Sequence, residues 1–120
     1  MKTTSYEISK QLAEAGFKAK SIFGWHVDGK GCAPSYPLSP TATGYFWSYD
    51  LETILEALPN FIANKNKGEN CLVIDVAFGE IHYEGDSDND AMFITTTEEN
   101  ESLADTVAKM WLELKKEGLV

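Results

Sequence analysis

The sequence predicts an α+β domain, in which an antiparallel sheet, made of a hairpin and a three-stranded meander, has about three helices packed on one face. Segments with apolar residues at helical spacing alternate with short β-branched and aromatic runs. Tight-turn pairs such as Asp28-Gly29 separate several of these runs and favour hairpins. The 120 residues, 43% of them apolar, suffice for one core and are few for two, so we expect residues 1–120 to form a single domain.

The first helix is expected over about residues 5–15. Thr4 and Glu7 have the spacing of a capping box, in which each side chain accepts a backbone N–H that the helix leaves unpaired. Apolar residues recur from Ile8 at helical spacing, and Gly16 is typical of the position just after a helix.

A hairpin and a loop follow this helix. Residues 21–27 form the expected first strand, and its return begins at 31–33 after the Asp-Gly turn. Three prolines exclude a helix or a central strand from the first half of 34–49. We expect an ordered loop there, followed by a short strand near 44–47.

The second helix is expected to begin at a cap provided by Ser48 or Asp50 and to end near Pro59. Residues 60–70 are rich in asparagine, lysine and glycine, and we expect an exposed turn region there.

Residues 71–78 are the clearest strand, and Gly79-Glu80 predicts a two-residue turn into a return strand over 81–84. Phe78 then lies opposite Ile81. The apolar side chains of this hairpin share one buried face: Leu72, Ile74, Val76, Phe78, Ile81 and Tyr83. The other face carries Asp75, His82 and Glu84 and should meet water, and a third strand is expected over 91–95.

The last helix is expected to begin at Thr97 or Asn100 and to end at Gly118. Its apolar stripe consists of Leu103, Val107, Met110, Trp111 and Leu114. Its polar side consists of Glu101, Asp105, Lys109, Glu113 and Lys116, with Asp105–Lys109 and Glu113–Lys116 pairs.

The charge distribution restricts the possible partners. The net charge is −9, and all ten basic residues are lysine. Residues 68–105 contain eleven acids and no base, which argues against nucleic-acid binding and favours a basic protein surface as the partner. The predicted acidic patch consists of Asp75, Glu80, Glu84, Asp86, Asp88, Asp90, Glu98, Glu99 and Glu101. The alternative reading is that these acids only keep the protein soluble.

The aromatic and proline-rich segment 34–49 suggests a second kind of site. Its rings could form a groove for a small ligand or a peptide, or they could close the open end of the core. The candidate stacking residues are Tyr36, Tyr45, Trp47 and Tyr49.

Three motifs that could carry chemistry are weak. The spacing of Asp86, Asp88 and Asp90 resembles the start of a calcium loop, but the glycine and glutamate that such a loop needs are replaced by Ala91 and Thr97. His26, Asp28 and Cys32 are close in sequence, but no known nucleophile signature surrounds the cysteine.

His82 near carboxylates could bind a metal or exchange a proton, although an exposed strand histidine that eases carboxylate repulsion is the simpler reading. An enzyme that uses Cys32 or His82 with nearby carboxylates is the third hypothesis. The favoured reading has no catalytic residue, no metal and no cofactor.

The N-terminus lacks the apolar stretch of a secretory signal, and no segment approaches the length that spans a bilayer. We therefore expect a cytoplasmic protein without a membrane partner. Cys32 and Cys71 are expected to be free thiols that act as small buried apolar residues.

Several segments in order resemble a loose group of small proteins from phages and from bacterial genomes that carry prophages. The residues that carry the resemblance are Thr4–Phe17, Trp25-His26, Tyr49–Glu52 leading to Ala57-Leu58-Pro59, Gly79–Glu84 and Leu103–Leu119. The resemblance covers nearly the whole chain and implies an architecture and an origin, and the group has no established activity to transfer. The expected function is that of an accessory protein acting by protein–protein contact, with a ligand- or peptide-binding module as the alternative.

Overall fold

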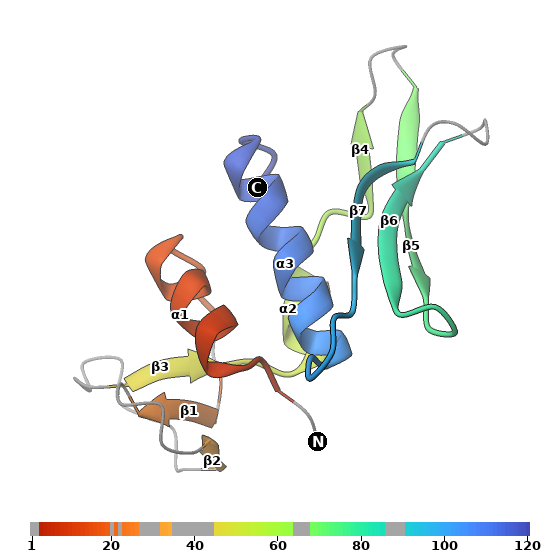
Figure 1. Cartoon of the computed structure of the whole chain (residues 1–120). Coiled ribbons are helices and arrows are strands. Elements are labelled where there is room, and N and C mark those ends of the chain that lie inside the picture. Colours follow the sequence, from red (N-terminus) through yellow and green to blue (C-terminus); the bar gives the residue numbers. More distant parts are fainter. Residues whose placement is uncertain are drawn as a thin grey trace.

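The computed structural model describes residues 3–19, 21, 23–26, 32–34, 45–63, 68–85 and 91–120, and these contain three helices and seven strands (Figure 1). Every strand pairing is antiparallel, which confirms the predicted α+β class. The helices are α1 (Tyr6–Glu14), α2 (Leu51–Ala57) and α3 (Leu103–Lys116). The strands are β1 (Phe23–His26), β2 (Cys32–Pro34), β3 (Tyr45–Ser48), β4 (Phe61–Ala63), β5 (Glu69–Asp75), β6 (Glu80–Glu84) and β7 (Met92–Thr96).

Helix α1 begins one residue later than its predicted cap. Ser5 is the N-cap, and its hydroxyl accepts the N–H of Ile8. Thr4 is fully buried, and its hydroxyl oxygen accepts the N–H of Tyr49 at 3.0 Å and lies 2.7 Å from Ser9 Oγ. The predicted cap at Thr4 is therefore wrong because tertiary contacts use that side chain to fasten the N-terminal segment to the end of β3.

The first sheet has the order β2-β1-β3. Phe23 pairs with Pro34 on one side and with Ser48 on the other. The predicted antiparallel return at 31–33 and the short strand near 44–47 are confirmed within a residue or two by β2 and β3. The predicted Asp-Gly turn and most of the proline-rich loop lie outside the described residues.

Asp50 caps α2, and its carboxylate accepts the N–H of Thr53 at 2.8 Å. The next strand, β4, overturns part of the predicted turn region at 60–70. Ile62 in β4 is buried and pairs with Asn70. A three-residue strand is too short for sequence periodicity to reveal, and it becomes recognisable only through its backbone pairing with β5.

The second sheet has the order β4-β5-β6-β7. Its central hairpin turns over four residues, Val76–Gly79, instead of the two predicted, so Ile81 lies opposite Ile74 rather than Phe78. This slip of four residues is even and preserves which face each side chain occupies. Ile81 and Tyr83 are buried as predicted, but Val76 falls in the exposed turn, and so does Phe78.

Strand β7 contains a bulge where it pairs with β6. Tyr83 pairs with Met92 and Ile81 with Thr95, so β7 has one residue more than its partner over this stretch. Phe93 accommodates the extra residue with a φ of 54°, an uncommon value for a residue with a side chain.

Helix α3 begins at Ser102 rather than at Thr97 or Asn100. The hydroxyl of Ser102 accepts the N–H of Asp105, whose carboxylate accepts the N–H of Ser102 in return. Asp105 is buried instead of exposed, because its other carboxylate oxygen also accepts the N–H of Ser5 at 2.7 Å. The helix ends before Gly118, which has a φ of 73°, as the sequence predicts.

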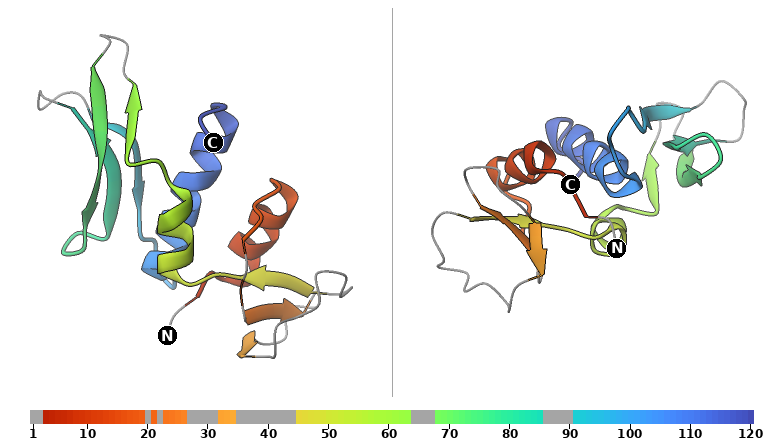
Figure 2. Two further views of the ribbon diagram at one scale, coloured as in Figure 1. Left: turned by 180° about the vertical axis from the view of Figure 1, so that it is seen from behind. Right: turned by 60° about the horizontal axis from the view of Figure 1, so that its bottom comes forward.

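The three helices lie between the two sheets (Figures 1 and 2). Helix α1 packs on the first sheet, α3 packs on the second, and α2 packs beside α3. Phe17 joins the two halves, because its ring makes edge-to-face contacts with Tyr49 and with Trp111. One face of the second sheet is thereby covered by helices, and its other face is turned away from them.

Candidate functional site

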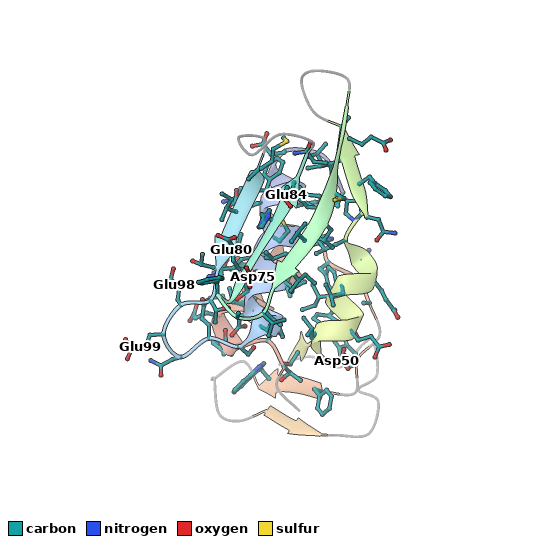
Figure 3. All side chains as sticks on the ribbon, turned by 90° about the vertical axis from the view of Figure 1, so that its right-hand side faces the viewer. Asp50, Asp75, Glu80, Glu84, Glu98 and Glu99 are labelled. Carbon is teal, nitrogen blue, oxygen red and sulfur yellow. The ribbon has the colours of Figure 1, made fainter. Side chains whose placement is uncertain are left out.

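The face of the second sheet that is turned away from the helices, called the outer face below, gathers carboxylates (Figure 3). Side chains alternate along a strand, so the residues between the buried ones belong to this face. Its members on β5 and β6 are Glu69, Cys71, Val73, Asp75, Glu80, His82 and Glu84. The strands β4–β7 carry no lysine, so His82 is their one basic side chain.

Two of these acids occupy directly opposed positions on β5 and β6. Asp75 pairs with Glu80 at the end of the hairpin. Like charges at opposing positions of an antiparallel pair lower stability. His82 Nδ1 lies 3.1 Å from Glu80 Oε2 and is the cation-capable group next to this pair. His82 shares this face with Asp75 and Glu84, as the sequence predicts, but the longer turn places it opposite Val73 rather than Ala77.

The acids after β7 divide into two environments. Glu98 and Glu99 are exposed in the segment that leads to α3. Glu101 is partly buried and pairs with Lys109, with 2.7 Å between its Oε1 and the ammonium nitrogen. The predicted Asp105–Lys109 pair is therefore wrong, since Lys109 is held by Glu101 and by the carbonyl of Thr96.

Burial alone would raise the pKa of Glu101, but hydrogen bonds from Lys109 and from the N–H of Glu98, with the charge of the lysine, lower it. Glu101 is thus a neutralised member of the predicted patch. Asp86, Asp88 and Asp90 lie outside the described residues. Of the predicted acidic patch, the members that are described and carry no ion pair with lysine are the sheet carboxylates, Glu98 and Glu99.

The aromatic alternative is only partly described. Tyr49 is buried, its ring centroid lies 4.7 Å from that of Phe17, and burial raises the pKa of its phenol to about 12. Trp47 packs partly buried against the core. The backbone of Tyr45 pairs with His26, while its side chain and all of Tyr36 lie outside the described residues. Tyr49 is therefore a core residue with no face open to a ligand.

The chemistry candidates do not converge in the described part of the chain. Cys71 is exposed, so the expectation of a buried thiol is wrong for this cysteine, because the odd positions of β5 face outward. The backbone of Cys32 pairs with Trp25, but the side chains of Cys32 and His26 lie outside the description. Among the described residues, no three histidine, cysteine, aspartate or glutamate side chains are placed to hold a metal ion.

A groove of about 930 Å³ lies between α1, α3 and β7, and sequence reasoning missed it. Ile8, Ile94 and Leu112 contribute apolar wall, and both Glu101 and Lys109 lie along it. Its walls come from segments far apart in the sequence, so no local pattern could have revealed it.

No helix in the described residues is long and apolar enough to cross a membrane. Comparison of the chain with models of protein families, with curated proteins and with solved structures found no match.

Proposed function

We propose that this chain is a small cytoplasmic accessory protein, of phage or prophage type, that acts by binding a host protein and not by catalysis. The partner presents a basic surface to the outer face of the second sheet. A host protein's nucleic-acid-binding surface has the chemistry that such an acidic face would match.

One observation carries this proposal. Glu69, Asp75, Glu80 and Glu84 share one face, and the strands of that sheet hold no lysine. Clustered charges of one sign steer the approach of an oppositely charged protein and set its orientation. Asp75 and Glu80 occupy opposed positions, where like charges repel in an antiparallel pair, so a basic partner would offset that repulsion.

The test compares two double substitutions that remove the same charge from different faces. Glu80→Gln with Glu84→Gln removes two of the four carboxylates of the outer face, and Glu7→Gln with Glu14→Gln removes two exposed carboxylates from α1. Immobilised wild type and both variants are incubated with host lysate, and bound proteins are identified by mass spectrometry at low and raised salt.

The proposal expects a discrete basic protein that binds the wild type and the α1 variant and is lost from the outer-face variant and at raised salt. Equal binding to all three chains, or binding that is indifferent to salt, contradicts it.

A further inference from the structure

The turn between β5 and β6, residues Val76–Gly79 and called the hairpin tip below, exposes two large apolar side chains. The side chain of Val76 is 74% exposed and that of Phe78 is 81% exposed. Both continue the apolar alternation of β5, which would bury them if the strand extended further. Because pairing stops at Asp75, they project beyond the sheet into solvent instead.

Hydrogen bonds within the turn and to Thr97 order the hairpin tip. Asp75 Oδ1 accepts the N–H of Phe78 at 3.3 Å, and the carbonyl of Val76 accepts the N–H of Gly79 at 3.3 Å. The carbonyl of Gly79 accepts the N–H of Thr97 at 2.7 Å.

The hydroxyl of Thr97 extends this anchoring to α3, since its oxygen lies 3.0 Å from the carbonyl of Gly79 and 2.6 Å from Thr106 Oγ1. An apolar group presented on a pre-ordered turn loses little conformational entropy when it binds.

Carboxylates flank the base of the hairpin tip. Asp75 and Glu80 form the last pair of the hairpin, directly beneath the turn. Glu98 follows Thr97, the residue that is bonded to the tip, and lies on the side of the molecule that Figure 3 shows. The exposed apolar group is therefore bordered by negative charge on both β-strands and on the segment before α3.

We propose that the hairpin tip inserts into an apolar pocket of the partner protein whose rim carries lysine or arginine. This inference rests on the proposed function and names the part of the surface that enters the partner. A central aromatic residue in a desolvated pocket typically dominates the affinity of an interface, while charged residues at its rim set orientation and approach. The same carboxylates repel an anionic lipid surface and the tip of a second copy of this chain.

The experiment uses the full chain with Phe78→p-benzoylphenylalanine, a photo-crosslinking residue, in host lysate. The matched control is Leu119→p-benzoylphenylalanine, since Leu119 is also exposed but follows α3, away from the outer face. The proposal expects a crosslink from position 78 to one host protein, at a segment that combines apolar residues with lysine or arginine, and a much weaker one from position 119. Excess wild type should compete, and Phe78→Ser should compete at least tenfold less well.

Several results overturn the proposal. These are crosslinking to another copy of the chain, crosslinking to added anionic or zwitterionic phospholipid vesicles, equal yields from positions 78 and 119, and the absence of any crosslinked host protein. Phe78→Ser should keep the melting temperature of the wild type, because its ring does not pack in the core. If the outer-face double variant loses the captured protein but Phe78→Ser does not, the hairpin-tip proposal fails and the proposed function stands. If neither substitution changes capture, both fail.

Discussion

The phenol of Tyr83 is fully buried, and its O–H donates to the carbonyl of Pro59 at 2.6 Å, which fastens β6 to the end of α2. Burial raises the pKa of this phenol to about 12. Between pH 10 and 12 the unfolded chain therefore releases a proton that the folded chain retains, and stability falls as the pH rises through this window.

Tyr83→Phe should lower the free energy of unfolding at neutral pH by about 1 kcal/mol, because the carbonyl of Pro59 loses its donor. It should also make the loss of stability above pH 10 shallower, leaving the part due to Tyr49. Urea unfolding followed by tryptophan fluorescence across the pH series measures both effects. An unchanged alkaline slope would show that Tyr83 ionises as freely in the folded chain as in the unfolded one.

Asp105 joins the starts of two helices that are distant in sequence. Its carboxylate accepts the N–H of Ser5 at the N-cap of α1 and the N–H of Ser102 at the N-cap of α3. Asp105→Ala removes both acceptors from a buried place, and we expect a loss of about 3 kcal/mol in the free energy of unfolding. Urea unfolding measures it, and Glu113→Ala on the more exposed side of α3 is the control. A loss no larger than that of the control would contradict this role.

At the scale of the element, the hairpin depends on a glycine that has two separate requirements. Gly79 has a φ of 62°, and a Cβ there would lie 3.0 Å from Thr97 Oγ1. Gly16 has a φ of 85° with nothing within 4 Å of its would-be Cβ. Gly16→Ala therefore measures the cost of the backbone conformation alone, about 1 kcal/mol, and Gly79→Ala should cost more because it also displaces Thr97. Thermal unfolding of both variants measures the difference, and equal losses would show that the contact with Thr97 adds nothing.

The same hairpin shows how far the sequence could predict an element. The alternation of apolar residues assigns Ile74, Ile81 and Tyr83 to one face, and this is correct for any even change of register. A two-residue and a four-residue turn both accept glycine at position 79, so the turn length could not be read from the residues. The carbonyl of Gly79 accepts the N–H of Thr97, a distant contact that the local sequence does not reveal.

Helix starts were ambiguous for a related reason. Thr97, Asn100 and Ser102 are all residue types that cap helices, and the spacing to Asp105 matches a capping box only for Ser102. Helical spacing assigned Asp105 to the polar side of the helix. Its burial could not be predicted, because its partner, the N–H of Ser5, belongs to the other end of the chain.

At the scale of the whole molecule, the chain is elongated, with extents of 46 × 28 × 19 Å. The sequence predicted helices on one face of an antiparallel sheet, and the structure places them between two sheets. Local patterns identify strands but do not state which strands pair across long separations, so the two-sheet arrangement and the groove between α1, α3 and β7 could not be predicted. The outer face, in contrast, follows from alternation within two strands and was predictable in part.

The two faces of the second sheet have different surroundings. Its inner face is stabilised by α3, while its outer face carries carboxylates and ends in the exposed hairpin tip. Under the proposed function, stability and recognition belong to opposite faces of the same strands, so outer-face substitutions should alter binding without unfolding the protein.

The most direct test of this account is the salt dependence of the affinity for the captured host protein, measured by titration for the wild type and for Glu80→Gln with Glu84→Gln. The account predicts that wild-type affinity falls steeply as NaCl rises from about 0.05 to 0.5 M, and that the variant binds more weakly at low salt with a shallower dependence. The same slope and affinity for both chains would contradict the claim that the outer face of the second sheet recognises a basic partner.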